Sequence, residues 1–222
     1  MKVYTIFGID PKDFKLLKMQ KNFFIIIVAT AIGMMVLYED IAFMIGFLTF
    51  VISLFTLSTI SYDEFDNGYA FLFTLPVSRT GYTVEKYCFS LLLGGSAWIV
   101  SVLLAVIASL QKEAASLSDT MMIALMLVPF MLVIQAVMIP IQLKFGGEKG
   151  RIVITATIGL LCIIGIAIVK GAEIFGIDML NVINHLPRIP LGTLIAAATA
   201  AAIGVWLVSM KISFSIMNKK EF

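Results

Sequence analysis

Long apolar runs separated by short charged segments are the dominant pattern along this chain. About 20 consecutive apolar residues in a helix cross a hydrocarbon layer of about 30 Å. The runs are continuous rather than alternating, and a backbone in lipid must satisfy its hydrogen bonds within each segment, so they indicate helices rather than barrel strands. The pattern therefore predicts an all-α integral membrane protein with six transmembrane helices, at Phe23–Tyr38, Ile41–Ile60, Cys88–Leu110, Met121–Leu143, Ile152–Val169 and Leu191–Met210.

The composition agrees with this pattern. Of the 222 residues, 60% are hydrophobic and 14% are charged, and the mean hydropathy is +1.04. A soluble domain carries roughly a quarter charged residues. A water-facing fold with one core is therefore excluded, and we expect a single transmembrane domain over residues 1–222.

The basic residues predict the orientation, because they gather on the cytoplasmic side of a membrane. With the N-terminus inside, thirteen of the 16 Lys and Arg residues fall in cytoplasmic segments. The outer loops hold only Lys112, Lys170 and Arg188. Both termini are therefore expected in the cytoplasm.

The predicted spans contain no Asp, Glu, Lys, Arg or His, and Gln135 is the most polar side chain deep within one. Ion-driven transporters need titratable groups inside the membrane, and an intramembrane hydrolase needs a nucleophile with its base. Both classes are disfavoured. Residues 146–150 are glycine-rich but do not match the phosphate-binding loop motif, and Cys88 and Cys162 have the character of packing residues. We expect no enzyme activity, cofactor or metal in this chain.

The N-terminal segment, residues 1–22, is expected to form an interfacial helix on the cytoplasmic side. Asp10 is a suitable helix cap and Pro11 a suitable first helical residue. Lys12, Lys15 and Lys18 recur at helical spacing on one side, with apolar side chains on another. This pattern is typical of a helix at the membrane surface. It serves either as a topological anchor or as a surface for a partner.

The inner loop at residues 61–87 has the most distinctive pattern outside the spans. An acidic cluster, Asp63, Glu64 and Asp66, precedes an aromatic-rich run that Pro76 ends. The aromatic helix lies either flat on the bilayer interface, where aromatic residues are common, or in a cytoplasmic subunit. The residues that fit one face of this helix are Phe65, Tyr69, Leu72 and Phe73.

Two inner segments carry a resemblance to a known family. The first begins Tyr62-Asp63-Glu64 and continues with Leu75-Pro76-Val77-Ser78-Arg79, Tyr82, Glu85, Lys86 and Tyr87. The second contains Pro140, Lys144-Phe145-Gly146 and Glu148-Lys149-Gly150-Arg151. At these positions in a six-span chain, the two segments resemble the short permeases of bacterial ABC-2 exporters. That group includes permeases that export phenol-soluble modulins, which are amphipathic cytolytic peptides.

The resemblance implies an exporter of two permeases, either two copies or a pair of paralogues, with two ATPase subunits that bind ATP and Mg. It also implies a coupling helix at about Tyr62–Leu75 that docks on the ATPase. The residues expected to contact the ATPase are Tyr62, Asp63, Glu64, Phe65, Tyr69, Phe71 and Arg79. A network expected to hold the inner loops together, or to meet the ATPase rim, comprises Lys86, Lys144, Glu148, Lys149 and Arg151. The alternative for these charges is simple positive-inside topology.

The outer loop at residues 170–190 resembles the half-helices that close the external side of such permeases. Pro129 and Pro140 are expected to kink the fourth span, and small residues in the sixth favour close helix packing. The function expected is ATP-driven export of amphipathic peptides across the bacterial cell membrane, with lipid and peptide as partners and no nucleic acid. The alternatives are an exporter of a lipid or an antibiotic, a membrane scaffold or sensor subunit, and an ion-coupled transporter.

Overall fold

The computed structural model describes residues 11–38, 40–65, 68–74, 77–111, 117–174 and 190–220, and these residues form helices without a strand. The chain starts with α1 (Pro11–Met19) and α2 (Lys21–Tyr38), which meet at a sharp bend of 61°. The remaining helices are α3 (Ile41–Ser53), α4 (Phe55–Glu64), α5 (Gly68–Leu72), α6 (Arg79–Gln111), α7 (Leu117–Ile174) and α9 (Leu191–Lys219).

Four segments among the described residues are long and apolar enough to cross a membrane. They are Ile41–Glu64, which joins α3 and α4, Arg79–Ser109, Leu117–Gly147 and Leu191–Lys219. The bent pair of α1 and α2 adds a fifth if it counts as one span. The fifth predicted run, Ile152–Val169, lies within the helical second part of α7. The six-span count stays a prediction.

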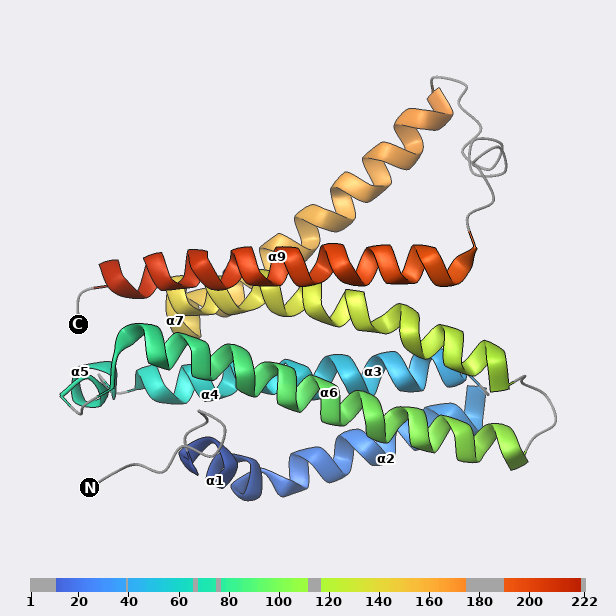
Figure 1. Ribbon diagram of the computed structural model, residues 1–222, viewed down its shortest axis with the longest axis horizontal. Coiled ribbons are helices and arrows are strands. Elements are labelled where there is room, and N and C mark those ends of the chain that lie inside the picture. The colour runs from blue at the N-terminus through green and yellow to red at the C-terminus, as the bar shows by residue number, and fades with distance from the viewer. Residues whose placement is uncertain are drawn as a thin grey trace.

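The helices lie side by side in one bundle, and α7 is the exception (Figure 1). Its first part runs along α9, and its second part turns back and leaves the bundle at an angle. The start of α1, the end of α9 and the short α5 lie at the same end of the bundle (Figure 1). We call this end the loop end, because α5 marks it.

The turn in α7 occurs at Gly146, which has a φ of 78° and a ψ of −175°. Pro129 and Pro140, which were expected to kink this helix, lie inside it and keep helical backbone angles. A side chain strains a backbone with positive φ, and glycine does not carry that cost. The redirection of α7 therefore depends on a glycine and not on either proline.

The segment expected to form a coupling helix at about Tyr62–Leu75 is divided. The membrane helix α4 continues to Glu64, and helix resumes only in the five-residue α5. Leu75 lies outside the described residues, as do residues 175–189 of the outer loop, so the predicted half-helices there are not described. The described part of the predicted coupling segment is thus the end of α4 followed by the short separate helix α5.

Apolar packing differs between the two ends of the bundle. Towards the far end, side chains of α2, α3, α6 and α7 pack around Met44, Ile45 and Ala105. At the loop end, the buried cluster is rich in tyrosine and includes Tyr69, Tyr82 and Tyr87. Burying tyrosine requires partners for its hydroxyl group. The loop end is therefore where polar chemistry concentrates.

Candidate functional site

Charged side chains from several helices meet at the loop end. We call this set the polar junction, and it comprises Asp13, Asp63, Glu64, Arg79, Tyr82, Lys86 and Lys220. A buried charge is costly unless it is paired and hydrogen-bonded. Each charged member of the polar junction has such a partner, as the following contacts show.

Lys86 lies at the centre of the polar junction and is 0% exposed. Its Nζ donates to Asp13 Oδ2 of α1 at 2.7 Å and pairs with Asp63 Oδ2 of α4 at 2.8 Å. Lys12 Nζ lies 3.0 Å from the other Asp63 oxygen, so two ammonium groups face two carboxylates. This arrangement ties α1 to the ends of α4 and α6.

Two tyrosines in contact attach α5 to this cluster. The Tyr82 hydroxyl lies 3.0 Å from Asp63 Oδ2, to which it donates, and 3.4 Å from the Tyr69 hydroxyl. The Tyr69 and Tyr82 rings meet edge to face with centroids 5.7 Å apart. Tyr69 is 3% exposed, and burial raises the pKa of its hydroxyl because it disfavours the phenolate. Tyr69 therefore anchors α5 inside the chain.

Glu64, the last residue of α4, contacts two distant parts of the chain. Its Oε2 accepts from the Gly147 backbone N–H at 2.8 Å, directly after the turn in α7. Its Oε1 pairs with Lys220 Nζ at 3.1 Å. Lys220 also donates to the Leu143 carbonyl at 3.1 Å and lies 4.8 Å from the centroid of the Tyr69 ring. Glu64 thus joins α4, α7 and the end of α9.

Arg79, the first residue of α6, holds the C-terminal end of α9. Its Nη1 donates to the backbone carbonyls of Met217, Asn218 and Lys220 at 3.1, 3.0 and 2.8 Å. The last carbonyls of a helix have no partner within the helix, and a positive charge there is also favourable. Arg79 therefore caps α9 from another helix.

Three aromatic side chains next to the polar junction face outward. Tyr62 is 53% exposed, Phe65 is 79% exposed and Phe71 is 71% exposed. They lie at the end of α4 and in α5, next to the half-buried Asp63 and the buried Tyr69. The loop end thus combines an exposed aromatic surface with a polar base of paired charges.

A family model described as ABC-2 family transporter protein matches residues 11–218. This chain belongs to the ABC-2 transporter family. No curated protein and no solved structure gives a match. An ABC-2 family protein is a membrane transport component and not itself a catalyst, and it normally works with an ATPase subunit. Its family and its membrane-crossing helices together make this chain a multi-pass membrane protein.

The structure of this ABC-2 protein separates the seven predicted ATPase contacts into two groups. The three aromatic residues Tyr62, Phe65 and Phe71 form the exposed surface. The other four lie in internal contacts, and they are Asp63, Glu64, Tyr69 and Arg79. Whether any of them touches an ATPase stays a prediction, but only the first group is displayed outward in this chain.

The predicted inner-loop network is brought together only in part. Lys86 lies in the polar junction, while Lys144 and Lys149 are exposed. The side chains of Glu148 and Arg151 lie outside the described set. Sequence reasoning missed Asp13, Tyr82 and Lys220 as junction members. Asp13 sits among lysines of α1 and its partner Lys86 is 73 positions away, so local periodicity offers no signal for the pair.

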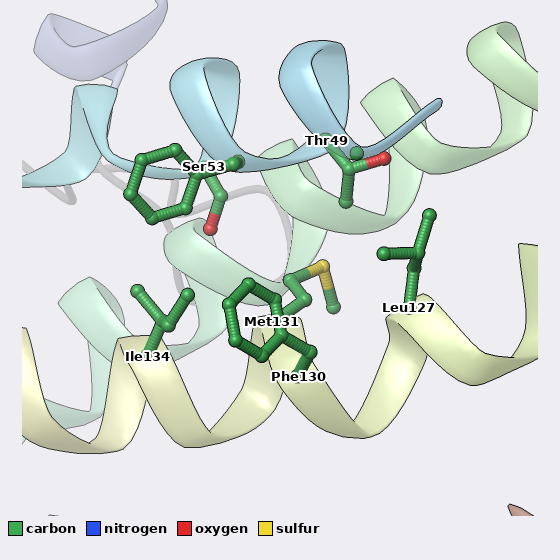
Figure 2. Close-up of a pocket in the computed structure, with 8 residues that line it drawn as sticks. Thr49, Ser53, Leu127, Phe130, Met131 and Ile134 are labelled. Carbon is green, nitrogen blue, oxygen red and sulfur yellow. The ribbon is translucent and has the colours of Figure 1, made fainter. Parts of the chain in front are cut away.

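Within the spans of the ABC-2 bundle, the described residues include a small polar cluster beside a small, partly open pocket between α3 and α7 (Figure 2). Thr49 and Ser53 of α3 line the pocket opposite Phe130 and Met131 of α7. Gln135, predicted to be the most polar side chain in a span, donates to Ser53 Oγ at 2.6 Å and to the Ser90 carbonyl at 3.0 Å. These bonds tie α3, α6 and α7 together inside the membrane region.

Among the residues described, no group of three His, Cys, Asp or Glu side chains is placed to hold a metal ion. Cys88 is a free thiol that packs beside Phe55 and Phe89.

Proposed function

We propose that this chain is the permease subunit of an ATP-driven exporter, and that a separate ATPase subunit docks on the loop end. The observation that carries this proposal is the exposed aromatic surface formed by Tyr62, Phe65 and Phe71 beside the polar junction. Buried aromatic anchors supply much of the binding energy of protein interfaces. Because Asp63 and Tyr69 beneath this surface bond to α6, motion of a docked subunit reaches the membrane helices directly.

Replacing Phe71 with alanine is expected to weaken binding of the ATPase subunit at least tenfold, with a larger loss when Phe65 is also replaced. Removing a central aromatic anchor typically costs about 2 kcal/mol or more. The measurement is copurification of the ATPase from the native membrane in mild detergent, followed by titration of the purified subunits.

Phe43→Ala is the matched control, since Phe43 is an exposed aromatic side chain at the start of α3, remote from the loop end. It is expected to leave ATPase binding unchanged. Equal retention of the ATPase by the wild type and by the Phe65/Phe71 double variant would contradict the docking proposal. A preparation without any ATPase subunit would favour the scaffold alternative.

The cargo we propose is an amphipathic peptide, taken from the cytoplasm or the inner leaflet. The predicted spans are uncharged, and the polar groups in the described part of them are small or aromatic, such as Ser53, Gln135 and Trp98. Such a lining suits an apolar face with a few hydrogen bonds better than it suits an ion or a sugar. A lipid is the second candidate, because the pocket between α3 and α7 is lined mainly by apolar side chains.

The cargo classes are separated by ATP hydrolysis of the complex in nanodiscs. An amphipathic helical peptide is expected to stimulate hydrolysis at least twofold. A peptide of the same composition, scrambled to remove its apolar face, is expected to have no effect. If added lipid stimulates ATP hydrolysis and neither peptide does, the peptide proposal is wrong and lipid export is favoured.

A further inference from the structure

We propose that Glu64 is a positioning residue that sets the direction of the second part of α7, residues 147–174, and so transmits movement of the loop end to that helix. The proposal rests on the proposed function only for the source of the movement. The geometry that carries it involves Glu64, Gly146, Gly147 and the opposite contact through Lys220.

The carboxylate of Glu64 caps a helix that begins 83 positions further along the chain. The first backbone N–H groups of a helix have no partner within it, and negative charge is favourable there. Such a cap usually comes from the residue just before the helix. Here the Gly147 N–H, at the start of the second part of α7, donates to Glu64 Oε2 at 2.8 Å. The helix start is thus attached to the end of α4.

Gly146 fits closely around the same carboxylate. A Cβ atom at this position would collide with both carboxylate oxygens of Glu64, and the φ of +78° already disfavours any other residue. A glycine with this freedom permits several directions for the helix that follows it. The bond from Gly147 to Glu64 selects one of them.

A second contact holds the other side of the turn. Lys220 Nζ donates to the carbonyl of Leu143, which precedes Gly146, and pairs with Glu64 Oε1. A continuous bridge therefore runs from Leu143 through Lys220 and Glu64 to Gly147, across the point where α7 turns. Both sides of the turn are held by side chains that come from outside α7.

The bridge ends next to the proposed docking surface. Phe65, the most exposed of its aromatic residues, directly follows Glu64 in the chain. Movement of α4 and Phe65 with a docked subunit displaces the Glu64 carboxylate and the helix that it caps. The second part of α7 already lies apart from the other helices, so it is free to swing (Figure 1).

The test is a distance measurement by electron spin resonance on the full chain in nanodiscs, without an ATPase. Spin labels are placed at Ile163 in the second part of α7 and at Ile212 in α9, both exposed, with Cys88 and Cys162 replaced by alanine. Ile163 lies roughly 24 Å beyond Gly147 at 1.5 Å per residue, so a rotation of about 15° moves it by about 6 Å.

Glu64→Ala is expected to shift or broaden the distance distribution by about this amount. Glu64→Gln keeps an oxygen that accepts the Gly147 N–H but loses the ion pair with Lys220, so it is expected to shift the distribution less than Glu64→Ala does. Lys220→Met removes the contacts of Lys220 with Glu64 and with the Leu143 carbonyl, at a side chain that is partly exposed. It is also expected to broaden the distance distribution, and it replaces Glu64→Ala as the test if that variant does not fold.

The control is Asp40→Ala, which removes an acidic cap from the start of α3, where Asp40 Oδ1 accepts from the Phe43 N–H at 2.9 Å. It is expected to leave the distribution unchanged. Superimposable distributions for Glu64→Ala and the wild type would overturn the proposal, as would a shift with Glu64→Gln as large as that with Glu64→Ala. No ATPase is present in this experiment, so its result does not depend on whether the ATPase docks at the loop end. Likewise, a failure of the Glu64 proposal leaves the docking proposal unaffected.

Discussion

Replacing Lys86 with methionine is expected to lower the free energy of unfolding by about 3–5 kcal/mol. The side chain is fully buried, and its ammonium group faces Asp13 at 2.7 Å and Asp63 at 2.8 Å. Removing one partner of a buried ion pair leaves the other charge without compensation, which is the costly case. Lys12 pairs with Asp63 and still compensates that carboxylate, so the loss falls mainly on Asp13. The measurement is equilibrium unfolding in mixed detergent micelles, followed by circular dichroism.

Two further variants make this result specific. Lys18→Met is the matched control, since Lys18 is an exposed lysine of α1, and a change below about 0.5 kcal/mol is expected. The triple variant Asp13→Asn, Lys86→Met, Asp63→Asn is expected to recover most of the loss, because it removes the uncompensated charge of Asp13 together with that of Asp63. The amide introduced at position 63 still offers an oxygen to Tyr82. A Lys86→Met protein as stable as Lys18→Met would show that the three side chains do not form a buried cluster.

The helical membrane architecture could be predicted from the apolar runs, because the backbone of a span in lipid must satisfy its hydrogen bonds internally. Helix boundaries at the loop end could not. The third run was expected to begin at Cys88, but α6 begins at Arg79, since its first turns bury Tyr82, Lys86 and Tyr87 among polar partners. When a span is predicted as a run of uncharged residues, its predicted boundary falls at the first charged residue. A charged residue that is paired inside the protein, such as Lys86, does not end the helix.

The resemblance of the inner segments to ABC-2 permeases is confirmed by the family match, while the peptide-exporting branch stays a proposal. The role of individual residues was harder to predict. Tyr69 and Phe71 are two positions apart in a five-residue helix, yet Tyr69 is 3% exposed and Phe71 is 71% exposed. Helical periodicity predicts which residues share one face of a helix. In a five-residue helix with apolar residues on more than one face, it does not predict which face packs against the rest of the protein.

Adjacent glycines of α6 are expected to respond in opposite ways to the same substitution. A Cβ atom at Gly94 would lie 2.6 Å from Met131 Sδ, 2.8 Å from Gln135 Nε2 and 3.2 Å from Ser53 Oγ, whereas at Gly95 it would meet nothing within 4 Å. Overpacking of this kind costs about 1–3 kcal/mol. Alanine is otherwise favoured over glycine inside a helix by up to about 1 kcal/mol. Gly94→Ala is therefore expected to destabilise the protein, and Gly95→Ala to leave it unchanged or slightly more stable.

The pair is measured by the same unfolding experiment, with each glycine serving as the control for the other. Met131→Ala removes the nearest clash but leaves a cavity of its own, so the two are compared in a double-mutant cycle. Gly94→Ala is expected to cost less in the Met131→Ala background than in the wild type, but not nothing, because the contact with Gln135 remains. Gln135 bonds both Ser53 and the Ser90 carbonyl, which means that displacing it loosens three helices at once. Equal effects of the two glycine substitutions would mean that α6 does not approach α3 and α7 closely at Gly94.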